Sequence, residues 1–242
     1  MTPEVLFYAF LGGVLPAILW LYFWLREDAR CPEPKSMIVL AFITGMLAVF
    51  LVLPLEYYAR GVLSGTALIV AWAVIEEVVK FFVALIVILW RRAVDESIDF
   101  VMYMITIALG FAALENALFL YSPLALGDVW GSINLGNLRF FGATLLHVLA
   151  SGTIGFALAF SYQLMKKFHM SAAVVLLSTA TLVGLGLAIA VHVAFNILIS
   201  SEEVRGIIGA LLMVWIGVVT FFILFEILKY MRYRNKPKNM CS

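Results

Sequence analysis

Six ionisable side chains lie deep inside apolar segments of this 242-residue chain, where charged groups are rare. A charge at the centre of a bilayer costs about 2.5–3.5 kcal/mol on insertion scales, so such groups are expected to face the protein interior and pair with one another. They are carboxylates, imidazoles and one ammonium group, which serve in proton transfer and metal binding. The six are Glu76, Glu77, Lys80, Glu115, His147 and His192, and Asn196 lies one helical turn after the last.

Helical spacing brings several of these side chains together. Lys80 follows Glu77 by three residues and Glu76 by four, so the lysine can pair with either carboxylate. Adjacent side chains on a helix point about 100° apart, which lets one glutamate enter a site while the other is neutralised by Lys80. His192 and Asn196, four residues apart, share one helix face.

Two imidazoles and a carboxylate on separate helices form the ligand set of a catalytic zinc site, with a fourth position left for water. A further carboxylate could then act as general base on that water, while Lys80 and Asn196 could orient ligands or stabilise an oxyanion. A structural interpretation stays open for each group alone, because membrane histidines also form interhelical hydrogen bonds and a Glu–Lys cluster can be a structural ion pair.

The composition identifies the medium in which these helices fold. Hydrophobic residues make up 64% of the chain and charged residues 13%, and the mean hydropathy is +1.07. A soluble domain has about 45–50% apolar and about 25% charged residues, so soluble, disordered and disulfide-rich secreted proteins are excluded. The net charge is +1 and the basic residues are scattered, so no nucleic-acid partner is expected.

Apolar runs of about 20 residues predict an all-α membrane protein, a bundle of seven transmembrane helices. Lys and Arg number twelve on one set of alternate connections and three on the other, which predicts an outside N-terminus and a cytoplasmic C-terminus. Residues 122–138 are expected to form a loop, residues 1–230 the membrane domain and residues 231–242 a basic cytoplasmic tail. The predicted spans are 4–25, 36–56, 64–90, 100–121, 139–164, 171–199 and 206–228.

With a rise of about 1.5 Å per residue, the ionisable groups should share one layer in the outer half of the membrane. Glu115, His147 and His192 lie on the order of 10 Å below the outer ends of their spans, and Glu76 on the order of 18 Å. Four helices that run in alternating directions would therefore present acids and imidazoles at a similar level.

Four motifs on successive helices resemble the PrsW family of intramembrane proteases, which belongs to the clan of the CAAX-processing and bacteriocin-processing membrane proteases. Glu76-Glu77-Val-Val-Lys80 resembles the family motif E-E-x-x-K, and Phe111-Ala-Ala-Leu-Glu115-Asn116 resembles F-x-x-x-E-N. The stretch 139–159, which contains His147, resembles the third motif, and His192-Val-Ala-Phe-Asn196 resembles the closing H-x-x-x-N/D motif. The segments 28–34 and 95–99 also look like family features.

The resemblance implies an intramembrane endopeptidase that cleaves a single-span membrane protein such as an anti-sigma factor, in a prokaryotic plasma membrane. Glu76 would be the general base, and Glu115, His147 and His192 would surround zinc or a glutamate-activated water without metal. We expect cleavage near the extracytoplasmic side, because unwinding a substrate helix is least costly where water reaches the freed backbone. Three alternatives use the same residues differently: a transporter or proton relay, a haem-binding cytochrome with His147 and His192 as axial ligands, and a structural scaffold.

Overall fold

The computed structural model describes residues 2–28, 32–168, 178–201 and 203–234, and these residues are almost entirely helical with no strand. Long apolar segments must satisfy their backbone groups internally in lipid, which selects helices. The elements are α1 (Pro3–Glu27), α2 (Lys35–Val62), α3 (Gly65–Ala84), the π-helical η1 (Leu85–Leu89), α4 (Ser97–Ala125), α5 (Val129–Leu138), the π-helical η2 (Arg139–Ala143), α6 (Thr144–Phe168), α8 (Thr179–Ile199) and α9 (Val204–Arg234).

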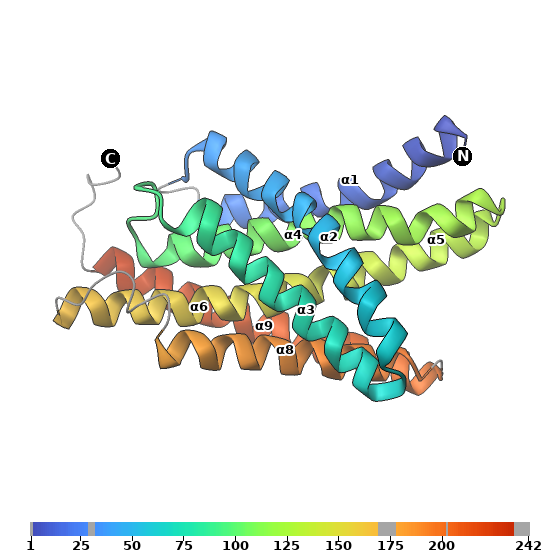
Figure 1. Cartoon of the computed structure of the whole chain (residues 1–242). Coiled ribbons are helices and arrows are strands. Elements are labelled where there is room, and N and C mark those ends of the chain that lie inside the picture. Colours follow the sequence, from blue (N-terminus) through green and yellow to red (C-terminus); the bar gives the residue numbers. More distant parts are fainter. Residues whose placement is uncertain (1, 29–31, 169–177, 202, 235–242) are drawn as a thin grey trace.

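Helix α4 is the central element of the bundle. Every residue from 98 to 113 is buried, which agrees with a helix that is apolar on all sides. Helices α1, α2 and α6 pack against α4, and α2 and α3 cross the front of the bundle at an incline (Figure 1). Backbones of α2 and α4 approach closely, because a Cβ atom on Gly45 would lie 2.0 Å from the Ile107 carbonyl oxygen and one on Gly110 1.9 Å from that of Phe42.

Six of the described helical segments are long and apolar enough to cross a membrane. They are α1, α2, α4, the continuous stretch from α5 to α6, α8 and α9. The predicted third span is the exception, because the 20 residues of α3 carry Glu76, Glu77 and Lys80. Helix α3 nevertheless packs against α2 and α8 where it crosses the front of the bundle (Figure 1). The element that contributes most to the buried polar cluster is thus the least suited to lipid contact.

Segment boundaries differ from the predicted ones around residues 122–138. The expected loop is largely helical, because α4 continues to Ala125 and α5 begins at Val129. The turn between them uses Gly127 with φ +73°, and the Asp128 side chain accepts a hydrogen bond from the Gly131 backbone N–H, capping α5. Residues 171–177 of the predicted sixth span and residues 235–242 of the predicted tail lie outside the described residues.

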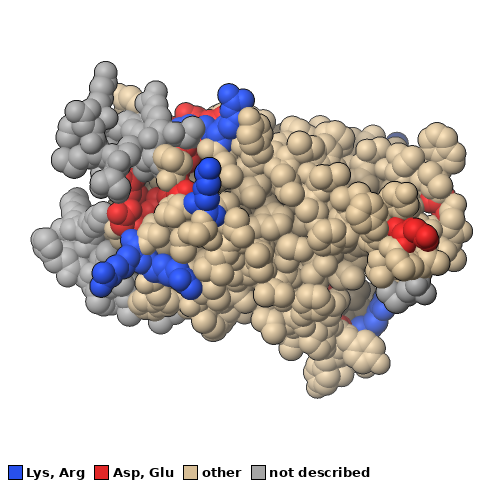
Figure 2. Space-filling model, turned by 90° about the horizontal axis from the view of Figure 1, so that it is seen from above, with Lys and Arg blue, Asp and Glu red and all other residues tan. Residues whose placement is uncertain are grey.

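Charged side chains are unevenly distributed over the surface. Figure 2 shows Lys, Arg, Asp and Glu gathered mainly toward one end of the visible face, with a broad band free of these residues along its middle. The start of α1 and the end of α9 lie at opposite ends of the bundle (Figure 1). An uncharged belt between polar ends is the surface that a bilayer requires.

Candidate active site

Helix α3 presents two adjacent glutamates in different surroundings. Glu77 is fully buried, and its Oε1 atom lies 2.5 Å from Lys80 Nζ and 2.8 Å from His192 Nδ1. Glu76 is 5% exposed, and its Oε2 atom is buried but accepts no hydrogen bond from the described residues. Because side chains at i and i+1 diverge by about 100°, Glu77 is neutralised while Glu76 stays available.

Two imidazoles from different helices flank Glu76. His192 on α8 places Nε2 3.8 Å from Glu76 Oε1, and His147 on α6 places Nδ1 3.9 Å from Glu76 Oε2. These separations exceed a direct hydrogen bond, and they leave space for a bridging group between the carboxylate and the rings. Acids and imidazoles from three different helices therefore lie close together in the fold.

Neighbouring groups set the donor and acceptor roles of each imidazole. An ammonium group only donates, so His147 Nδ1 accepts from Lys80 Nζ at 3.0 Å, and its Nε2–H then donates to Glu115 Oε2 at 3.0 Å. His192 Nδ1 donates to the Glu77 carboxylate, and in the neutral ring this leaves the Nε2 lone pair for the site. His192 is thus arranged as a metal or water ligand with a carboxylate behind it.

Four residues could together hold a metal ion. One ligand atom from each lies within 4.8 Å of all the others, and all four side chains are buried. Nitrogen and carboxylate donors suit Zn²⁺, and the unpartnered Oε2 of Glu76 is an orphaned acceptor of the kind that an ion satisfies. The four residues are Glu76, Glu77, His147 and His192.

Glu115, a predicted ligand, lies at the edge of this group. It contacts His147, but its Oε2 also accepts a hydrogen bond from Arg139 Nη2. Arg139 in addition donates from Nε to Asn116 Oδ1 at 2.5 Å and stacks over the Phe119 ring at 3.9 Å. Arg139, the first residue of η2, therefore ties η2 to α4 at Glu115 and Asn116 and occupies the Glu115 carboxylate.

The cluster forms the inner wall of a cavity of about 960 Å³. Glu76, Glu115, His147 and His192 line it, and so does Asn196, the last predicted site residue. The cavity extends to exposed residues at the ends of helices, which makes the buried cluster accessible from one end of the bundle; these residues include Tyr57, Arg60, Ser122 and Ser200.

The fold brings six of the seven predicted residues into one contact network, and Asn196 lines the same cavity. Sequence reasoning gave no role to Arg139 or to Glu56, which also lines the cavity. A signal was present for each. Arg139 begins the stretch that resembles the third motif, and Glu56 stands at the end of a predicted span, one turn before Arg60.

Curated relatives described as protease PrsW match part of the chain. The protein of Geobacillus kaustophilus is 34% identical over 114 residues, which are 45% of this chain and 50% of the relative. The Bacillus subtilis protein is 29% identical over 45% of this chain and 52% of its own length, and the Clostridioides difficile protein is 26% identical over 47% and 50%. The chain thus aligns with about half the length of these relatives, and no solved structure matches it.

A family model gives wider coverage than these pairwise alignments. The model described as PrsW family intramembrane metalloprotease matches residues 33–226, a range that contains all seven predicted site residues and both histidine-bearing helices. Since this match covers most of the 242 residues, the chain belongs to the PrsW family of intramembrane metalloproteases.

Proposed function

We propose that this protein is an intramembrane endopeptidase that hydrolyses a peptide bond of a membrane-anchored protein near the extracytoplasmic side. The observation that carries the proposal is the buried Glu76 carboxylate, whose Oε2 accepts no hydrogen bond from the described residues and which lies between two histidines in a cavity that reaches the surface. A transporter or proton relay is not favoured, because family membership and a cavity reaching one end of the bundle both favour proteolysis.

Water activation is assigned to Glu76. A water molecule between Glu76 and His192 Nε2 would give its proton to the carboxylate and attack the substrate carbonyl with its oxygen. The protonated Glu76 would then pass that proton to the departing amine nitrogen as the C–N bond breaks. Glu77 keeps the His192 ring oriented through the 2.8 Å hydrogen bond to Nδ1. Asn196, on the cavity wall, is assigned to the developing oxyanion, for which an amide N–H is a suitable donor.

The same side chains fit a divalent metal. Glu76, His147 and His192 would hold it, and Glu76 would then serve as a ligand in place of its role as base. This set replaces Glu115 of the sequence-based assignment, because Arg139 engages Glu115. A bound zinc ion would supply a water whose pKa is lowered to about 7. If His147 binds the metal through Nδ1, Lys80 must give up its contact with that atom; if His147 binds through Nε2, the contact can remain. In either case the ion pair with Glu77 keeps Lys80 in the site.

The membrane arrangement completes the proposal. We assign seven spans with α3 as the third, shielded from lipid on its charged side, and a cytoplasmic C-terminus in a prokaryotic plasma membrane. Residues 1–230 form the protease domain and 231–242 the basic tail. The cavity end would then face the extracytoplasmic side, where a substrate helix can unwind at low cost.

Cleavage mapping tests the proposal. The purified protein is reconstituted with a single-span substrate, and the product termini are determined by mass spectrometry. A protease-protection assay locates the C-terminus. We expect cuts at or just outside the extracytoplasmic end of the substrate span. Cuts at the cytoplasmic boundary, together with a cytoplasmic C-terminus, would contradict it.

A further inference from the structure

Glu56 on α2 is a third carboxylate in the cavity wall, beside Glu76 and Glu115. The residue is partly buried, and no described side chain donates a hydrogen bond to its carboxylate or forms an ion pair with it. By contrast, Glu77 pairs with Lys80 and Glu115 with Arg139. Arg60, one turn beyond Glu56, is placed over the Trp72 ring at 5.8 Å instead.

The position of Glu56 is fixed by the same tryptophan. Trp72 Nε1 donates to the Glu56 carbonyl oxygen at 3.4 Å, which ties this turn of α2 to α3. Both residues line the cavity, and the Glu56 carboxylate interacts electrostatically with Glu76 and Glu115. Glu56 is therefore part of the wall that a cavity occupant must contact.

A carboxylate in such a wall favours one kind of occupant. Most of the lining side chains are apolar, so a bound polypeptide would displace water from around Glu56 and leave its charge poorly solvated. A cationic group on the bound segment would offset this cost by a charge-assisted hydrogen bond. Lys and Arg have long apolar stems that can lie along such a wall with the charged group at the carboxylate.

We propose that Glu56 is a specificity-determining residue that selects polypeptide segments with a Lys or Arg side chain near the bond to be cleaved. The inference rests on the proposed protease function and deepens it by naming a chemical feature of the substrate. Glu56 recognises the side-chain cation, while Glu76 and the histidines act on the backbone.

Binding measurements test this without requiring turnover. Apolar peptides, acetylated and amidated at their ends, carry one Lys at successive positions, or norleucine or Glu in its place. Their Kd values are measured by fluorescence anisotropy on the full chain in nanodiscs of zwitterionic lipid. At the best position we expect the wild type to bind the Lys peptide at least about tenfold more tightly than the norleucine peptide, as for one charge-assisted hydrogen bond.

Variants at Glu56 should change that preference in a defined order. Glu56→Asp keeps the charge and should retain a preference for Lys, Glu56→Gln should bring the two Kd values together, and Glu56→Lys should favour the Glu peptide. Glu203→Gln is the matched control, because Glu203 is an exposed carboxylate at the start of α9 that does not line the cavity. Thermal unfolding of each variant establishes that it is folded.

The outcomes separate the two proposals. Equal Kd values for the Lys and norleucine peptides on the wild type, no binding of any peptide, or a preference that survives in Glu56→Gln would overturn the role of Glu56. The same peptides are also incubated with the wild type and analysed for products. Cleavage without a charge preference contradicts only the inference, whereas a Glu56-dependent binding preference without cleavage of any peptide contradicts only the protease function.

Discussion

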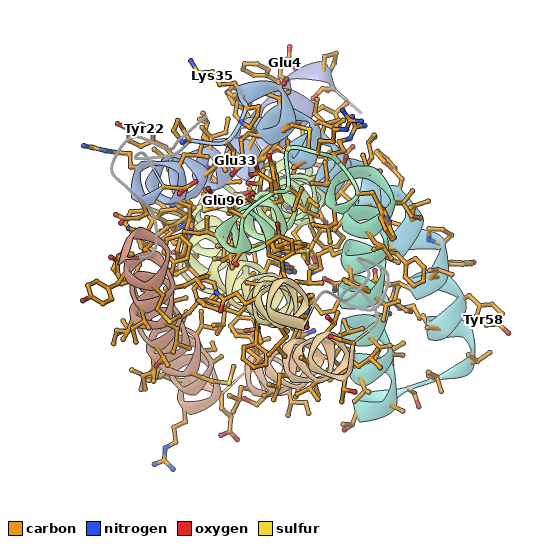
Figure 3. All side chains as sticks on the ribbon, turned by 90° about the vertical axis from the view of Figure 1, so that its left-hand side faces the viewer. Glu4, Tyr22, Glu33, Lys35, Tyr58 and Glu96 are labelled. Carbon is orange, nitrogen blue, oxygen red and sulfur yellow. The ribbon has the colours of Figure 1, made fainter. Side chains whose placement is uncertain are left out.

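The two ends of α4 both carry carboxylates that face other helices, but only one end has the features of a reaction centre. Glu115 lies at the cavity, while Asp99 lies at the opposite end, about 24 Å away by helical rise. We call the group around Asp99, made of Glu33, Glu96, Asp99 and Tyr103, the opposite cluster. Figure 3 looks onto this end, with Glu33 and Glu96 labelled near one another.

The opposite cluster is organised by hydrogen bonds that hold structure. Asp99 Oδ2 accepts from the backbone N–H groups of Asp95 at 2.9 Å and Glu96 at 2.7 Å, which completes the capping box at the start of α4. The Tyr103 hydroxyl donates to Glu33, linking α4 to the segment before α2. None of these four residues lines the cavity.

Burial of an ionisable group does not by itself identify an active site. The cavity end combines carboxylates with imidazoles from two further helices and is reached from the surface. In the opposite cluster the carboxylates cap the N-terminus of α4 and accept a hydrogen bond from Tyr103. Access from the surface, and a ligand set that mixes imidazole nitrogen with carboxylate oxygen, distinguish the two regions.

The strongest test of the comparison is a matched pair of isosteric changes. Glu76→Gln should lower the cleavage rate by roughly 10²–10⁴-fold, because an amide cannot accept the proton from water. Glu33→Gln in the opposite cluster should leave cleavage unchanged. Product formation from a single-span substrate is measured for both, with thermal unfolding as a check on folding. Near wild-type cleavage by Glu76→Gln would remove Glu76 as the base.

Metal analysis distinguishes the residues of the cavity end that hold a metal ion from those that do not. We expect about one zinc per chain by elemental analysis, lost in His192→Ala, and a zinc Kd roughly 10–100-fold weaker in Glu77→Gln, because Glu77 orients the His192 ring. The Glu115→Gln variant should still bind zinc, because in the fold Glu115 pairs with Arg139. An active preparation that is free of metal and insensitive to chelators that reach the site would assign the chemistry to Glu76 alone.

Arg139 tests whether the end of α4 must be held in place. Arg139→Lys keeps the charge but loses the two-point contact with Glu115 and Asn116 and the stacking on Phe119, so kcat should fall roughly tenfold. As a positioning residue, Arg139 should affect kcat more than KM. A change in unfolding temperature with unaltered kcat would mean that the contact is only structural.

The smallest expected effect is a pH dependence of stability in the opposite cluster. Burial, and then the neighbouring Asp99 carboxylate, raise the pKa of Glu33 to about 9 from an ordinary 4.5. The folded protein therefore keeps a proton that the unfolded chain releases, so this stabilising contribution is complete below about pH 4.5 and is lost as the pH rises toward 9.

Glu33→Gln removes this titration. The decrease in unfolding temperature between pH 6 and pH 9 should be smaller in Glu33→Gln than in the wild type, as measured by differential scanning fluorimetry in detergent. Parallel curves for the two proteins would show that Glu33 exchanges no proton on unfolding in this range.

Several features of this protein follow from its sequence alone. Composition and apolar run lengths determine a helical membrane protein, because lipid leaves backbone groups no partner outside their own helix. The cost of charge in lipid likewise predicts that Glu76, Glu77, Lys80, Glu115, His147 and His192 face one another, and the contacts among them confirm it.

Tertiary structure decided how those groups are paired. Helical spacing allowed Lys80 to pair with Glu76 or Glu77. In the fold Lys80 Nζ lies 2.5 Å from Glu77 Oε1 but 3.8 Å from Glu76 Oε2, and His192 Nδ1 also donates to Glu77. Arg139 engages Glu115, which the sequence placed among the metal ligands. Glu56 lines the cavity, and no described side chain pairs with its carboxylate. Spacing along one helix fixes only which side chains share its face, whereas contacts between helices depend on how their axes cross and rotate, which packing of the whole bundle sets.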